Sequence, residues 1–174
     1  MRKGDFGLKV LACDELDNGL VLVKHMQQYK LRLSNFNATL SCDASVEIDG
    51  RFVGRFRIKP YSSISIERPT NDTGKFTFYR HGTSEAKIAG LVGREIEGII
   101  SVTYHQEKPE EVIFLFIEHE LRRNESGDEM SGGTGLSGIS SDRYEQADKI
   151  NINPHSEVTI QTRLICHDEP RPLI

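Results

Sequence analysis

The chain has 174 residues, of which 37% are hydrophobic and 28% charged, and its net charge is -4. This is the balance of a water-soluble globular domain that is long enough to bury its own core, and it excludes a disordered chain. The mildly acidic charge lacks the electrostatic footprint of a nucleic-acid binder. No segment reaches the ~18 apolar residues that a membrane helix needs. We therefore expect neither nucleic acid nor a membrane among its partners.

The start of the chain and its cysteines indicate the compartment. Residues 1–5 lead into a mixed polar segment without the apolar run of a signal peptide, so we expect a cytoplasmic protein. The three cysteines, Cys13, Cys42 and Cys166, are an odd number without metal-type spacing. We interpret them as small buried hydrophobic residues in a reducing compartment.

Period-two alternation of apolar and polar residues predicts strands along nearly the whole chain. In chain order the predicted strands are 7–14, 19–25, 28–34, 42–48, 51–58, 62–68, 75–80, 97–105, 111–121, 146–152 and 157–166. Only 83–92 favours a short helical turn, capped by Thr83 or Ser84. Many short, evenly spaced strands are typical of sandwiches and barrels. We predict one all-β domain over 1–174, an antiparallel, jelly-roll-like β-sandwich of about ten strands.

Asp49-Gly50, between alternating apolar residues, is a strong hairpin signal. A two-residue loop would place Glu47 opposite Phe52 and so mix charge into the apolar face. A three-residue loop, Ile48–Gly50 with a left-handed Gly50, instead sets Val46 opposite Phe52. We therefore predict the three-residue, bulged hairpin, with Phe52 in the core.

The connections between the later strands are less regular. Turns are predicted at 59–62, joining 51–58 to 62–68, and at 107–110, joining 97–105 to 111–121. The run Val112–Ile117 is apolar on both faces, which indicates a central strand or a strand covered by a partner chain. The Gly- and Ser-rich range 124–142 is predicted to be a long loop. Prolines in 167–174 predict an extended tail.

The sequence carries no established catalytic pattern. Gly132-Gly133-Thr134-Gly135 resembles a phosphate cradle, but no Lys-Ser/Thr pair or helix follows it. The serines of 127–141 do not form the nucleophile elbow of a hydrolase. His105 and His119 flank the predicted 107–110 turn, and with Glu118 they are the basis of a hydrolase hypothesis. We predict no cofactor, no metal and no catalytic residue.

Charged and aromatic side chains on strands are the candidates for surface contact. Arg51, Arg55, Arg57 and Lys59 alternate along one predicted strand, either as a solvated face or as a contact patch. Tyrosines are the available aromatic platforms, since Trp is absent. The predicted interaction residues are Arg51, Arg55, Arg57, Tyr61, Tyr104 and Tyr144, with Tyr79 as a further aromatic candidate for sugar binding.

Two stretches carry a resemblance to a known family. YKLRLSNFNATLSCDASVEIDGRFVGRFRIKPYSSISIERP, starting at Tyr29, and GGTGLSGISSDRY, starting at Gly132, resemble a family of uncharacterised β-rich proteins of bacteria, protists and large DNA viruses. The resemblance spans 28–165 and consists of strand and turn patterns. It implies a β-sandwich that works by surface contact, with no activity to carry over. The viral relatives imply a role in a virion or another assembly.

Three functions follow as hypotheses from these observations. The first is a non-enzymatic structural or assembly protein, a subunit of a virion, fibre or other large assembly, that binds protein partners or itself. The alternative is a β-sandwich module that binds carbohydrate or a peptide strand. The third is a hydrolase built on the histidine and glutamate cluster.

Overall fold

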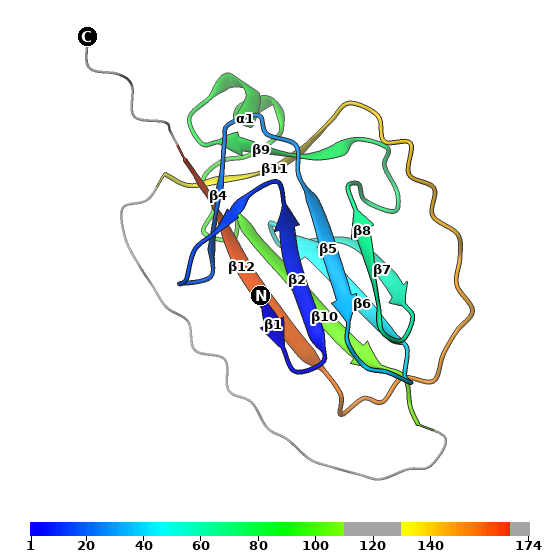
Figure 1. The fold of residues 1–174 in the computed structure, drawn as a ribbon. Coiled ribbons are helices and arrows are strands. Elements are labelled where there is room, and N and C mark those ends of the chain that lie inside the picture. Colours follow the sequence, from blue (N-terminus) through cyan, green and yellow to red (C-terminus); the bar gives the residue numbers. More distant parts are fainter. Residues whose placement is uncertain (110–129, 168–174) are drawn as a thin grey trace.

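A computed structural model of the protein describes residues 1–109 and 130–167 (Figure 1). Within them, strands and one short helix build two facing sheets and a two-stranded cap, which confirms the predicted all-β fold. The elements are β1 (Arg2–Lys3), β2 (Phe6–Leu11), β3 (Asp14–Glu15), β4 (Leu20–Val23), β5 (Lys30–Asn35), β6 (Cys42–Ile48), β7 (Arg51–Ile58), β8 (Ser62–Ile66), β9 (Lys75–Arg80), α1 (Ser84–Ile88), β10 (Ile99–Gln106), β11 (Gly132–Ser137) and β12 (Val158–Cys166).

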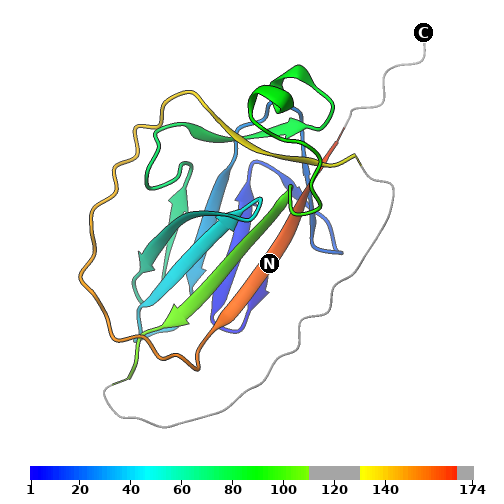
Figure 2. The ribbon, with the colours of Figure 1, turned by 180° about the vertical axis from the view of Figure 1, so that it is seen from behind.

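The two sheets lie face to face, as Figures 1 and 2 show from opposite sides. The first has the order β1-β2-β5-β8, and the second has the order β3-β4-β12-β10-β6-β7. Among the described strands every pairing is antiparallel except that of β4 with β12. The sandwich is therefore mixed rather than wholly antiparallel. Most of the chain separates β4 from β12, so no tight turn fixes their relative direction.

The core fills the space between the sheets with aliphatic and aromatic side chains from both. Tyr104 on β10 reaches across to the other sheet, where its hydroxyl donates to the carbonyl of Gly7 and its ring stacks on Phe6 with centroids 4.7 Å apart. Its side chain is fully buried. The prediction that Tyr104 is a surface contact residue is therefore wrong, because period-two patterning does not show which face of a strand is covered.

The β6–β7 hairpin differs from the predicted one. Its loop has two residues, Asp49 and Gly50, both with positive φ (55° and 74°), and Glu47 pairs with Phe52. A bulge at Val53 then shifts the register, so that later residues of β7 regain the apolar face. Phe52 stays on the outer face and is 63% exposed. The predicted core position of Phe52 is wrong because the bulge follows the turn instead of lying within it.

The Gly-rich part of the predicted 124–142 loop contains strand β11, which pairs with β9 as a cap over one end of the sandwich (Figure 1). A Cβ on Gly132 would lie 2.3 Å from Cζ of Phe78 and 2.6 Å from the carbonyl oxygen of Tyr79. Glycine is present here because the two strands and their side chains pack too closely for any other residue. Helix α1 lies beside this cap, and Thr83 caps it as predicted.

Two more predictions need correction, and some lie outside the described residues. The 59–62 turn does not close a hairpin, because β7 and β8 belong to different sheets. Residues 146–152 form no strand, and only Ile152 makes an isolated bridge, with Glu107. The predicted strand at 111–121 and the tail from 168 lie outside the described residues. No helix in the described ranges has the length and apolar character needed to cross a membrane.

Candidate functional site

A large hollow lies along one side of the sandwich, where β7 and β8 form the edges of the two sheets. Residues 140–153, which we call the strap, run past these edges without regular structure (Figure 1). The groove between the strap and the two strands has a volume of about 970 Å³. Its apolar lining includes Phe56, Ile64 and Ile66 of the sheets with Ile150 and Ile152 of the strap, and charged side chains also line it.

The strap is anchored at its start by two buried charged residues, Glu67 and Arg68. The hydroxyl of Ser140 donates to Glu67 Oε1 at 2.6 Å, and the guanidinium of Arg68 donates twice to the carbonyl of Asp142, at 3.0 and 2.8 Å. The bond from Ser140 outweighs burial and, with the ammonium of Lys30, holds the pKa of Glu67 below its ordinary value. Glu67 is therefore an ionised anchor for the strap.

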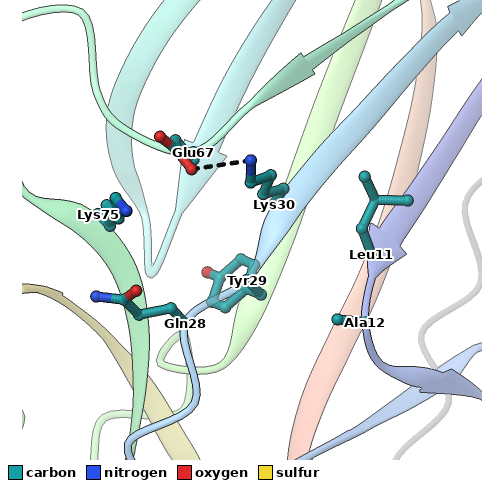
Figure 3. A pocket seen from close by; sticks show the side chains of 7 residues that line it. All are labelled: Leu11, Ala12, Gln28, Tyr29, Lys30, Glu67 and Lys75. Atoms are coloured by element: carbon teal, nitrogen blue, oxygen red, sulfur yellow. Dashed lines mark ion pairs between the residues drawn. The ribbon is translucent and has the colours of Figure 1, made fainter. Parts of the chain in front are cut away.

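A smaller cavity of about 380 Å³ lies on the far side of this anchor, and Figure 3 shows the side chains that line it. Lys30 Nζ lies 3.2 Å from Glu67 Oε2, the ion pair that is dashed in the figure. The carboxylate that holds the strap thus also pairs with Lys30, one of the two lysines that line this cavity. Glu67 therefore connects this cavity to the start of the strap.

Tyr144 completes the first anchor. Its hydroxyl donates to the carbonyl of Arg68 at 2.9 Å. The Arg68 guanidinium lies 4.0 Å from the centre of the Tyr144 ring, and the Phe56 ring packs against it at 5.4 Å with an interplanar angle of 71°. A sugar platform needs a free aromatic face, and Arg68 covers one face of this ring. Tyr144 fixes the strap to the groove and is only partly exposed.

The second anchor lies at the other end of the strap, beside the end of β10. Lys108 donates its backbone N–H to the carbonyl of Asn151 at 2.6 Å, and Asn153 donates to the carbonyl of Gln106 at 2.9 Å. Between the anchors, residues 145–149 are exposed and form no hydrogen bond or ion pair with other residues that the structure describes. The strap therefore crosses the groove as a span that is tied at both ends.

The floor of the groove includes an open strand edge. The carbonyl of Val53 on β7 accepts the N–H of Thr70 at 3.0 Å, so it points away from β6. Backbone groups alternate sides along a strand, and therefore the N–H and C=O groups of Arg55 and Arg57 also point away from β6. Within the described ranges no backbone group pairs with them there.

The side chains at this edge are mainly basic. Arg57 Nε lies 2.5 Å from Asp43 Oδ1, and Arg55 Nε lies 3.8 Å from Asp43 Oδ2. The Asp43 carboxylate thus pairs with both guanidinium groups, and Lys59 adds a third positive charge to the lining of the groove. Arg55 is half exposed, with 50% of its side-chain surface accessible.

The structure brings three of the predicted interaction residues, Arg55, Arg57 and Tyr144, to one groove. Arg51 lies at the hairpin end of β7, and Tyr61, 77% exposed, lies at the turn between β7 and β8. Tyr79, the further aromatic candidate, is buried in the cap, in a small cluster with Ala86 and Leu91. Sequence reasoning missed the strap, because alternation predicts a strand over 146–152, where the chain has no regular structure.

A second polar cluster, outside the groove, joins the cap to the loop before β10. His81 Nδ1 lies 2.7 Å from Ser131 Oγ, and His81 Nε2 lies 2.6 Å from Glu97 Oε2. Glu97 is fully buried and also accepts the backbone N–H groups of Val92 and Gly93. His81 and Ser131 face each other where the β9–β11 pairing begins, so these contacts are accounted for by fixing the cap to the loop.

The histidine and glutamate cluster of the hydrolase hypothesis is only partly within the described residues. His105 lies on β10, with its Nε2 3.4 Å from a carboxylate oxygen of Glu157. Glu118 and His119 lie outside the described residues. Among residues 1–109 and 130–167 no three His, Cys, Asp or Glu side chains gather as metal ligands would.

Comparisons with known proteins give no relative from which a function could be transferred: no family model, no curated protein and no solved structure matches this chain.

Proposed function

We propose that this protein is a non-enzymatic assembly module that holds a partner protein in the groove between β7, β8 and the strap. The observation that carries the proposal is the open backbone edge of β7 inside a groove of about 970 Å³. Exposed edges of sheets attract other chains, and proteins that do not use them cover them. Here the strap passes the edge without pairing with Arg55 or Arg57.

The composition of the groove suits a protein partner. It combines apolar side chains, Phe56, Ile64 and Ile66, with a rim of arginine, lysine and carboxylate groups. An apolar centre with a polar rim is the usual anatomy of a protein interface. A sugar-binding role has less support, because the ring of Tyr144 is already in contact with Arg68 and Phe56.

Site-specific photocross-linking tests this proposal. A benzophenone amino acid at Lys149, in the exposed middle of the strap, is expected to capture one defined protein in extracts of the native source. The matched control places it at Arg32, which is exposed on the outer face of β5. Reversing the charge with Arg55→Glu in the Lys149 probe should reduce the adduct about tenfold or more, because like charges at an interface are costly.

Mass spectrometry of the adduct identifies the captured protein, and a second copy of this chain would support the assembly role as well. Capture of the same proteins at Lys149 and Arg32, or an adduct that Arg55→Glu leaves unchanged, would contradict the proposal.

A further inference from the structure

We infer that the partner supplies an extended acidic segment, which joins the second sheet as an additional strand on β7 with carboxylates opposite Arg55 and Arg57. This inference rests on the proposed function, because it specifies what the same groove binds and how.

The first support is the pattern of backbone groups. A strand that joins an edge gains affinity from main-chain hydrogen bonds. At the start of β7 the edge is closed, because Thr70 donates to Val53 through both its backbone N–H and its hydroxyl. Beyond Val53, the outward groups of Arg55 and Arg57 have no such partner among the described residues. The open stretch therefore begins after Val53 and extends to the end of β7 at Ile58.

The second support is the alternation of side chains along that stretch. Arg55 and Arg57 pair with Ser45 and Asp43 of β6 on the outer face of the sheet, while Phe56 lies on the core side. A strand added beside β7 has the same alternation. Its residues opposite the arginines would face outward, and the residues between them would face Phe56 and the apolar part of the groove. The segment that fits is one in which acidic and apolar residues alternate.

The third support is the local charge. Arg55 and Arg57 share a single carboxylate, that of Asp43, and Lys59 lines the groove beside them, so this part of the rim carries more positive than negative charge. The acidic residues in the middle of the strap, Glu145 and Asp148, make no ion pair with these cations in the described structure. Charge complementarity at an edge therefore favours a partner with carboxylates.

The room for such a segment is already present. The groove lies between β7 and the unbonded span of the strap, so an added strand would be held between them. The open stretch from Gly54 to Ile58 matches a short strand of about five residues, a common strand length in proteins. The strap would then cover the bound segment while its two anchors, at Ser140 and Asn151, stay in place.

A titration with model peptides tests the inference on the full chain. The probe is a peptide of three Glu-Val repeats, and the comparison peptides are three Lys-Val repeats and a Glu-Val peptide N-methylated at alternate amides. Amide NMR shifts on ¹⁵N-labelled protein are expected at Arg55, Arg57 and the strap for the first peptide. The other two peptides should bind about tenfold more weakly or worse, since one reverses the charge and the other removes backbone donors.

Variants at Arg55 separate the two parts of the inference. Arg55→Ala removes the charge but keeps the outward N–H. Arg55→Pro also removes that N–H, and it leaves the bonds to β6 in place, since an edge strand tolerates proline where its N–H faces outward. The peptide and the cross-linked partner should bind weakly to Arg55→Ala and not measurably to Arg55→Pro. Arg32→Ala is the control and should bind like the unmodified protein.

Equal binding by Arg55→Ala and Arg55→Pro, together with equal binding of the N-methylated peptide, would overturn strand addition while the assembly role stands. Loss of cross-linking specificity at Lys149 would instead remove the assembly role itself. If Arg55→Pro does not fold, as judged by its thermal melt, the N-methylated peptide on the unmodified protein gives the same decision.

Discussion

Asp49 and Glu97 are buried carboxylates that tie loops of the protein to the cap. Asp49 accepts the backbone N–H groups of Gly98 and Thr134, both at 2.7 Å, and so links the β6–β7 turn to two distant segments. Burial raises the pKa of Asp49 in spite of these bonds. For Glu97 burial acts in the same direction, but bonds from Val92, Gly93 and neighbouring side chains prevail and lower its pKa to about 2.

The low pKa of Glu97 predicts a pH-dependent contribution to stability. A group whose pKa falls on folding stabilises the native state above its ordinary pKa, 4.5 here, and loses that contribution as the pH falls toward 2. At pH 7, Glu97→Gln should lower the free energy of unfolding by about 1–3 kcal/mol, because charge-assisted bonds are lost. Urea denaturation of both proteins at pH 7 and pH 3 measures the difference, which should shrink at pH 3.

Glu95→Gln is the control for this prediction, because Glu95 is exposed two residues away. It should unfold like the unmodified protein at both values of pH. A Glu97→Gln deficit that grows at pH 3 would show that the carboxylate is not held ionised by its neighbours.

At this scale the sequence predicted residue character better than residue position. Cys42 and Cys166 are buried, in line with their interpretation as small hydrophobic residues, although Cys13 is only partly buried. Burial raises the pKa of Cys42 to about 12. Phe52 was predicted to be buried and is exposed, because a bulge in β7 shifts the register. Tyr104 was predicted to be exposed and is buried, because the other sheet covers its face of β10. Neither change alters the alternation of apolar and polar residues in the sequence.

The strap forms one wall of the groove, and removal of a single oxygen atom, the Ser140 hydroxyl, is expected to weaken its first anchor. Ser140→Ala removes the hydroxyl that donates to Glu67 and accepts the N–H of Asp142. We expect trypsin to cleave at Arg143 and Lys149 about 5–30 times faster, the factor that corresponds to a loss of about 1–2 kcal/mol of local stability. Timed proteolysis with mass spectrometry measures the rates.

The control for the strap is Ser63→Ala, which removes a hydroxyl contact with Ser34 on the first sheet and leaves the strap untouched. Its cleavage rate at Arg143 and Lys149 should stay unchanged. Equal acceleration by both variants would mean that cleavage follows global unfolding rather than release of the strap.

Strands were predicted correctly where the alternation of apolar and polar residues is clear. They were missed where contacts with another strand determine the structure. Strands β5, β6, β7, β9 and β12 and the turn capped by Thr83 lie close to their predicted ranges. Strand β11 could not be predicted, because four of its six residues are Gly, Gly, Gly and Ser, which are typical of loops. These glycines form a strand only because β9 and its aromatic side chains lie against them.

At the scale of the whole molecule, the two sheets share one core, and Tyr104 connects them through Phe6 and Gly7. The sheets should therefore unfold together. Far-ultraviolet circular dichroism and tyrosine fluorescence are expected to give coincident urea transitions, since the chain has no Trp to mask the tyrosine signal. Tyr104→Phe should lower the midpoint by an amount that corresponds to about 0.5–1.5 kcal/mol, because the buried hydrogen bond between the two sheets is lost.

Two separated transitions would contradict the shared core. Tyr61→Phe is the matched control, since Tyr61 is largely exposed, and it should leave the midpoint unchanged.

The sequence predicted the class of the fold, but not which strand edges meet beside the strap. Strand pairing across 143 residues, as between Leu20 of β4 and Arg163 of β12, depends on contacts that local patterns do not encode. The same limit applies to the groove, since Arg55, Arg57 and Tyr144 were identified one by one without any sign that they lie together.

The tight β6–β7 turn has a consequence for the ageing of the protein. In flexible peptides an Asp-Gly pair rearranges slowly to isoaspartate through a cyclic succinimide, which forms when the glycine nitrogen attacks the aspartate side chain. In this turn both carboxylate oxygens of Asp49 are held by Gly98 and Thr134, away from that reaction. Isoaspartate at this position would therefore accumulate only in molecules in which the bonds from Gly98 and Thr134 to Asp49 have broken. Its level in a stored sample would measure how often the cap separates from the β6–β7 turn.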